Sequence, residues 1–199
     1  MIEVEKEEGL TRLVLNRPDK ANALTRAMLT DLRDAVRAAD TPALILSGRG
    51  KVFSAGMDLA AAKEGLATSP LWEELSGALA AYPGLTIAAL NGTCAGGSMG
   101  MALACDLRVA VPRASFFYPV MKLGFLPQPS DPGRMSALVG AARSKEIFMA
   151  GAKIDGETAL AWGLLNALAE DPLGQAADWA SDAIAAAPAH ASAIKALFS

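Results

Sequence analysis

The segment NGTCAGGSMGMALACDLRVA, residues 91–110, constrains the fold of this chain more than any other stretch. It follows the apolar run Leu85–Leu90, and the helical pattern Gly97–Ala104 lies within it. One large side chain, Met99, is surrounded by very small residues: Ala95, Gly96, Gly97, Ser98 and Gly100. Glycine inside regular structure costs about 0.5–1 kcal/mol relative to alanine. A strand, a glycine-rich turn and a helix therefore predict a place where a ligand or another element needs bare backbone amides.

Familiar nucleotide-binding motifs and several classes of partner do not fit the chain. The stretch GTCAGGSMG lacks the glycine spacing of a dinucleotide fingerprint, and no Gly-Lys-Ser/Thr follows it. A net charge of −3 without a basic stripe argues against nucleic acid. One histidine, His190, excludes a multi-histidine metal site. Cys94 and Cys105 lie in apolar surroundings and are expected to be reduced core residues.

Strand and helix patterns alternate along most of the chain, which predicts an α/β fold of βαβ units with a mostly parallel sheet. Expected strands are 2–7, 10–15, 43–46, 85–90, 106–111 and 164–168, and expected helices are 25–39, 71–82, 97–104, 134–138, 144–150, 157–163 and 173–198. Residues 1–170 are expected to form the core and residues 171–199 a C-terminal helical segment. The first ten residues lack the pattern of a signal peptide, and no apolar run is long enough to span a membrane, so we expect a soluble cytoplasmic protein.

Two further blocks give the pattern a family resemblance. GRGKVFSAGMDLAA, residues 48–61, is a second small-residue turn after a strand, and LNRPDKANALT, residues 15–25, precedes it. Together with residues 91–110 they resemble the crotonase family, the enoyl-CoA hydratase/isomerase group, over nearly the whole chain. The resemblance implies the spiral α/β fold that crotonases share with Clp-type peptidases, here with a shortened C-terminal helical tail. It also implies an acyl-CoA substrate, no cofactor beyond the CoA of that substrate, no metal, and assembly into a homo-trimer or hexamer.

The resemblance also assigns roles to residues. The backbone amides of Met57 and Gly97 match the family's oxyanion hole, which polarises a thioester carbonyl toward an enolate. Residues expected along the CoA or substrate are Lys20, Ala21, Ala23, Ala55, Asp58 and Leu59. The alternative explanation of the glycine-rich segment is close helix–sheet packing without a ligand. For the Gly56 turn the alternative is a plain turn in which Asp58 caps a helix.

The acid/base residues depart from the family pattern. Hydratases of the family hold a water between two glutamates, at positions that are Gly100 and Val120 here. Related isomerases and a dehalogenase keep a later acid, at the position of Gln128. Asp131 is the nearby carboxylate and the candidate acid/base, although it also suits the N-cap of a helix that begins at Pro132. Other side chains considered are Glu64, Glu73 and Glu74, expected as solvated helix charges, and Tyr118, expected to donate a hydrogen bond or to pack.

Three functions follow from these observations. The first is an enzyme of the crotonase type, in which isomerisation or decarboxylation is favoured over standard hydration because fewer catalytic groups are needed. The second is an acyl-CoA-binding protein without catalysis. The third is a serine hydrolase with Ser98 as nucleophile, which needs a base within hydrogen-bond reach. His190, the one histidine, is expected on the surface of the C-terminal helix. The sequence leaves open the acyl group, the reaction and the pathway.

Overall fold

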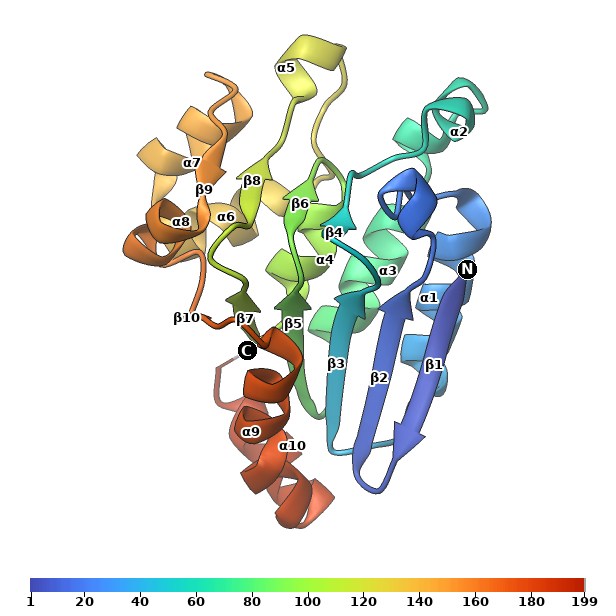
Figure 1. Ribbon diagram of the computed structural model, residues 1–199. Coiled ribbons are helices and arrows are strands. Elements are labelled where there is room, and N and C mark those ends of the chain that lie inside the picture. Colours follow the sequence, from blue (N-terminus) through green and yellow to red (C-terminus); the bar gives the residue numbers. More distant parts are fainter. Residues whose placement is uncertain (199) are drawn as a thin grey trace.

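The computed structural model describes residues 1–198; Ser199, the last residue of the expected C-terminal segment, lies outside the described residues. Two sheets stand end to end, with helices on both sides of the larger one (Figure 1). The larger sheet has six strands in the order β1-β2-β3-β5-β7-β10 and the smaller has four in the order β4-β6-β8-β9. The α/β architecture predicted from the alternating patterns is confirmed.

The larger sheet begins with the first two predicted strands, β1 (Ile2–Glu7) and β2 (Leu10–Leu15), which pair antiparallel as a hairpin. The remaining strands run parallel to β2: β3 (Ala43–Gly48), β5 (Leu85–Leu90), β7 (Leu107–Ala110) and β10 (Ala167–Leu168). Every residue of β3 is buried, as expected for a parallel strand that is covered on both faces. The C-terminal strand is shorter than predicted, because residues 164–166 lie outside regular secondary structure.

The smaller sheet was not predicted. Its strands are β4 (Val52–Ser54), β6 (Thr93–Ala95), β8 (Ser115–Phe117) and β9 (Ile154–Asp155). They are two or three residues long, too short for an alternating pattern to be visible in the sequence. The first three are parallel, and β9 pairs antiparallel with β8. Strand β4 follows β3 along the chain, and β6 follows β5. Because β4 and β6 pair with each other, the glycine-rich turns after them lie side by side.

Helices α1 (Arg26–Ala38), α3 (Leu71–Ala80) and α4 (Ser98–Ala104) cover one face of the larger sheet (Figure 1). Thr25 caps α1, because its side chain accepts a hydrogen bond from the Met28 amide. Further helices lie around the smaller sheet: α2 (Leu59–Lys63), α5 (Val120–Leu123), α6 (Asp131–Val139), α7 (Ala141–Phe148) and α8 (Gly156–Trp162). Single-turn 3₁₀ helices η1 (Pro18–Lys20) and η2 (Leu66–Thr68) complete this side.

The predicted C-terminal helix is two helices, α9 (Pro172–Ala185) and α10 (Pro188–Ala196). Proline cannot continue a helix through its own position, and Pro188 begins the second one. Ala176 and Ala180 of α9 are fully buried against Ile45 and Ile87, so this helix covers the second face of the larger sheet. Within residues 1–198, no helix is both long enough and apolar enough to cross a membrane.

Candidate active site

The turns after β4 and β6 lie against each other and require glycine. Gly56 and Gly96 have φ of +90° and +55°, a region in which residues with a side chain are strained. A methyl group added to Gly56 would lie 2.7 Å from the Ala95 carbonyl oxygen and 3.5 Å from the Gly96 Cα. The two turns are therefore in van der Waals contact through bare backbone, and any side chain at Gly56 would force them apart.

Each turn presents one amide that has no partner among the described residues. Within residues 1–198, neither the Met57 nor the Gly97 N–H donates a hydrogen bond, although their neighbours are paired: Gly56 donates to Ser54 Oγ and Gly96 donates to the Phe117 carbonyl. Unpaired amides on facing turns are the arrangement that stabilises a developing oxyanion. The two residues predicted for this role are thus on adjacent turns, with donors that no other group of the described chain uses.

The predicted CoA-binding segment is hydrogen-bonded onto the first of these turns. The Ala55 amide donates to the Ala21 carbonyl at 2.9 Å, and the Leu24 amide donates to the Gly56 carbonyl at 2.7 Å. Ala21 has a left-handed φ of +49°. These hydrogen bonds hold residues 21–24 against the turn that contains Met57.

Other residues predicted to contact CoA or substrate lie around the same turn. Lys20, Ala55 and Leu59 are exposed, and Ala23 is half-buried. Asp58 caps α2 by accepting from the Ala60 and Ala61 amides, and it pairs with Arg17 at 2.6 Å. The hydrogen bond from Arg17, followed by the Ala61 amide, lowers the pKa of Asp58. The structural role considered for Asp58 is therefore confirmed, and its side chain is already occupied.

Trp72 of α3 packs against Gly97, the second residue predicted for the oxyanion hole. Its ring carbons would lie 2.8–3.1 Å from a methyl group added to Gly97, and its Nε1 donates to the Leu66 carbonyl at 2.8 Å. The indole is buried and held by that hydrogen bond. Gly97 therefore has a packing role as well, because the indole occupies the space on its Cβ side. Sequence reasoning missed Trp72, since nothing in its spacing distinguishes it from the other buried residues of α3.

Asp131 does not act as the N-cap considered for it. α6 begins at Asp131 itself, and Ser130 precedes it as the cap residue. The Asp131 carboxyl is fully buried and accepts a hydrogen bond from the Tyr118 hydroxyl at 2.9 Å. Its Oδ1 has no hydrogen-bond partner within residues 1–198. Burial raises the pKa of Asp131 to about 6, against a smaller lowering by the Tyr118 hydrogen bond.

The Asp131 carboxyl lies beside Gly100, where the hydratases have a glutamate. A methyl group added to Gly100 would be 2.7 Å and 2.9 Å from the two carboxylate oxygens. Gly100 follows Gly97 by three residues, about one turn of helix. The Asp131 carboxyl, on α6, thus lies beside the α4 residue whose position is occupied by a glutamate in the hydratases. A glutamate at residue 100 would therefore clash with the Asp131 carboxyl.

Of the three other carboxylates considered, Glu73 and Glu74 have structural partners. Glu73 accepts from the Ser130 amide at 3.1 Å and from its hydroxyl at 2.6 Å, so Glu73, rather than Asp131, fastens the start of α6. Glu74 pairs with Arg33 at 2.6 Å. Glu64 is exposed, as expected for a solvated charge. Gln128 donates to the Ala67 carbonyl at 3.3 Å.

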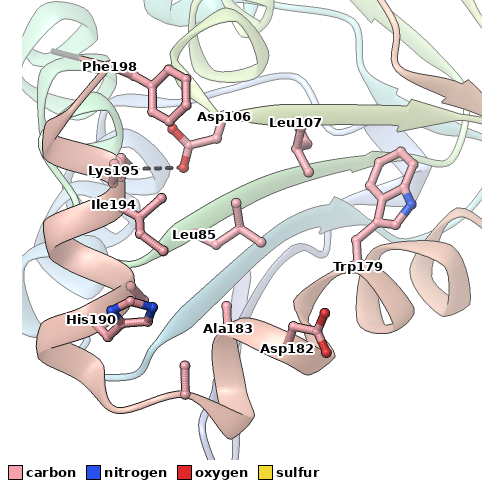
Figure 2. Close-up of a pocket in the computed structure, with 12 residues that line it drawn as sticks. Leu85, Asp106, Leu107, Trp179, Asp182, Ala183, His190, Ile194, Lys195 and Phe198 are labelled. Carbon is pink, nitrogen blue, oxygen red and sulfur yellow. Dashed lines mark hydrogen bonds and ion pairs between the residues drawn. The ribbon is translucent and has the colours of Figure 1, made fainter.

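Among residues 1–198, no histidine, lysine or carboxylate forms a hydrogen bond with the Ser98 hydroxyl. This hydroxyl is fully buried and lies 2.7 Å from the Ala95 carbonyl oxygen. His190 is exposed on α10, where it lines a cavity of about 760 Å³ formed with Leu85, Leu107 and Trp179 (Figure 2). Lys195 pairs with Asp106 at 2.8 Å on the wall of this cavity (Figure 2). None of the predicted site residues lines it. The geometry of a serine hydrolase is thus not present in the described residues.

Comparisons with known proteins agree with this geometry. The family model for enoyl-CoA hydratase/isomerase matches residues 5–199. The chain is 32% identical to a protein of Mycobacterium leprae named probable enoyl-CoA hydratase echA6, over 94% of this chain and 78% of the relative. It is 36% identical to a crotonyl-CoA hydratase of Syntrophomonas wolfei, over 82% of this chain and 66% of the relative.

Solved structures show the same fold. DspI of Pseudomonas aeruginosa superposes with a TM-score of 0.89 at 32% identity, covering 99% of this chain and 85% of that one. An enoyl-CoA hydratase of Bacillus anthracis superposes with a TM-score of 0.90 at 26% identity, over 98% of this chain and 80% of that one. The facing turns, the whole-length family match and these superpositions lead to one conclusion: the chain belongs to the enoyl-CoA hydratase/isomerase family and has the crotonase fold.

Proposed function

We propose that the protein binds an acyl-CoA thioester with its carbonyl oxygen between the Met57 and Gly97 amides, and that it moves a proton on the acyl group. The observation that carries the proposal is the pair of unpartnered amides on touching glycine turns. Amides fixed in this way stabilise the charge that develops on the oxygen when a proton leaves the acyl α-carbon. CoA enters as part of the substrate, and the proposed chemistry needs no other cofactor.

Asp131 is the proposed acid/base, which favours double-bond isomerisation. Its carboxylate takes a proton from C2 of a 3-enoyl-CoA, the charge is held on the thioester oxygen, and the resulting carboxylic acid returns the proton to C4. The C2–C3 double bond of the product forms as the C3–C4 double bond is lost. One carboxyl group suffices for both transfers, and a pKa of about 6 suits a group that alternates between its two forms near neutral pH. Hydration needs two positioned carboxylates, and residues 100 and 120 supply neither.

The test follows absorbance as 3-hexenoyl-CoA is converted to 2-hexenoyl-CoA, alongside hydration of crotonyl-CoA. We expect isomerisation by the wild type, a loss of about 10²–10⁴-fold in Asp131→Asn, and hydration slower than isomerisation by a similar factor. Glu64→Gln, which removes an exposed carboxylate, is the matched control and should retain activity. Full activity in Asp131→Asn would contradict the assignment, and fast hydration would contradict the reaction.

A second function, acyl-CoA binding without catalysis, is favoured by one observation. Asp131 is fully buried in the described structure, where it accepts a hydrogen bond from Tyr118 and lies against Gly100, so its carboxyl is not open to a ligand there. Calorimetry with butyryl-CoA and butyrate separates binding from turnover. Both functions require that the thioester binds and the free acid does not. Binding of crotonyl-CoA and 3-hexenoyl-CoA without conversion of either would favour the second function.

Assembly and location belong to the same proposal. By family resemblance we propose a homo-trimer or hexamer in the cytoplasm, acting in the metabolism of acyl-CoA thioesters. The exposed apolar side chains of α5 and the residues after it support assembly. They are Met121, Leu123, Phe125 and Leu126.

A further inference from the structure

We infer that Ser98 is a positioning residue, whose hydroxyl fixes the spacing between the two oxyanion donors. The inference rests on the proposed binding of a thioester carbonyl at Met57 and Gly97. Ser98 follows Gly97 directly and begins α4, so its side chain comes from the second turn. Its buried hydroxyl reaches across to the first turn.

The contacts of the Ser98 hydroxyl join both turns. Its Oγ lies 2.7 Å from the Ala95 carbonyl oxygen and 3.3 Å from the Ser54 carbonyl oxygen, and it accepts a hydrogen bond from the Ala95 amide at 3.1 Å. The single hydroxyl proton is therefore directed between the carbonyl ends of β4 and β6. The Ala95 carbonyl is also the group that Gly56 packs against most closely.

The backbone pairing of β4 with β6 does not reach the Met57 and Gly97 amides. The pairing of β4 with β6 ends at Ser54 and Cys94, and its register is irregular between Val52 and Ser54. Met57 and Gly97 lie three residues beyond this last pair on each strand. Their separation consequently depends on what holds the two turns after the ladder has ended, and the Ser98 hydroxyl contacts a carbonyl of each at that point.

A second buried hydroxyl ties the first turn to the segment before it. Ser54 Oγ donates to the Asn22 carbonyl at 2.8 Å and accepts from the Gly56 amide at 3.1 Å. Asn22 is fully buried, and its Nδ2 donates to the Arg49 and Val52 carbonyls. Ser98, Ser54 and Asn22 thus connect the three sequence blocks of the site through buried hydrogen bonds. Ser98 is the member that spans the two oxyanion turns.

The experiment compares Ser98→Ala with Ser47→Ala. Ser47 is an equally buried serine whose Oγ donates to the Ala89 carbonyl at 2.7 Å, between β3 and β5 and away from the turns. Crotonyl-CoA labelled with ¹³C at the thioester carbonyl is bound to each protein, and its carbonyl stretch is measured by difference infrared spectroscopy. Two aligned amides lower this frequency relative to free crotonyl-CoA. We expect Ser98→Ala to lose much of the lowering and to isomerise 3-hexenoyl-CoA about 10-fold or more slowly.

The infrared measurement distinguishes a positioning role of Ser98 from a general contribution to stability. Ser47→Ala should keep the wild-type frequency even if both variants lose similar stability, and Ser98→Thr, which retains the hydroxyl, should restore the shift. If Ser98→Ala does not fold, Ser98→Cys gives the same comparison with a weaker donor. An unchanged frequency in Ser98→Ala or Ser98→Cys would overturn the inference while leaving the proposed function intact. A wild type that binds crotonyl-CoA without any frequency shift would overturn both.

Discussion

At the scale of single residues, the carboxyl group of Asp131 is the least expected feature of the site. A carboxyl taken out of water favours its protonated form, and burial is the main reason that the pKa of Asp131 is raised from 3.8 to about 6. Tyr118 is buried beside it, its ring centroid 4.9 Å from that of Phe148, and burial together with Asp131 raises the pKa of its hydroxyl. The tyrosine therefore remains a hydrogen-bond donor to Asp131 over the whole range in which the carboxyl titrates.

The raised pKa predicts a pH-dependent stability. Between about pH 4 and pH 6 the folded protein keeps a proton on Asp131 that the unfolded chain has released, so the free energy of unfolding falls as pH rises through this window. The loss amounts to about 3 kcal/mol for a shift of this size. Urea unfolding at pH 4 to 7 should therefore show a steeper decline in the wild type than in Asp131→Asn. Parallel pH profiles for the two proteins would mean that the Asp131 pKa is not raised in the folded state.

Gly97 and Trp72 predict an energetic coupling. Gly97→Ala places a methyl group 2.8–3.1 Å from the indole carbons, which is too close for both to stay in place. We expect this variant to lose about 1–3 kcal/mol of stability and to bind butyryl-CoA more weakly. Trp72→Phe removes the outer ring and should recover part of both losses in the double variant. A double-mutant cycle measures the recovery; additive effects would show that the two residues do not press on each other.

At the scale of elements, the geometry of the site depends on turns rather than on the helices or strands themselves. Gly56→Ala and Gly65→Ala form a matched pair that tests this. Both glycines have a left-handed φ, of +90° and +77°, but a methyl group at Gly65 meets nothing within 4 Å. Gly65→Ala should lose about 1 kcal/mol from backbone strain, whereas Gly56→Ala should lose more and weaken butyryl-CoA binding. Chemical denaturation and calorimetry give both quantities. Equal losses would show that the contact between the turns contributes nothing.

The same elements show how far the sequence alone predicts this protein. The βαβ order is predictable, because a strand buried on both faces is a continuous apolar run, as at Leu85–Leu90. The glycine turns are predictable because a left-handed φ, as at Gly96, favours glycine. The smaller sheet is not, since its strands are too short to carry a period. The approach of Asp131 to Gly100 joins α6 to α4 across thirty-one positions and leaves no local pattern. The helix-start signal at Asp131 was misleading, because Glu73, distant in sequence, holds Ser130 instead.

At the scale of the whole molecule, exposed apolar side chains are concentrated in one segment of the surface. Most large apolar residues are buried around the sheets, yet Met121, Leu123, Phe125 and Leu126 are exposed together on the projecting α5 segment (Figure 1). Contiguous exposed apolar patches on a protein surface mark interaction sites. Copies of this chain are the partner that the family resemblance predicts. The segment also leads directly into Gln128 and α6, so an interface there would lie next to the candidate acid/base.

This arrangement predicts that the protein is a homo-oligomer and that the α5 segment contributes to its interface. Light scattering on the wild type should give a multiple of the 20.5 kDa chain mass. Leu126→Glu, at a side chain that is 88% exposed in the single chain, should shift the population toward monomer without lowering the stability of the monomer. Val4→Glu, on the edge strand β1 and 49% exposed, is the control and should leave the mass unchanged. A wild type that is monomeric at all concentrations would contradict the assembly, whereas an oligomer unaffected by Leu126→Glu would place the interface elsewhere. Because the α5 segment precedes α6, loss of the oligomer should also raise the KM for 3-hexenoyl-CoA, which separates a functional interface from a passive one.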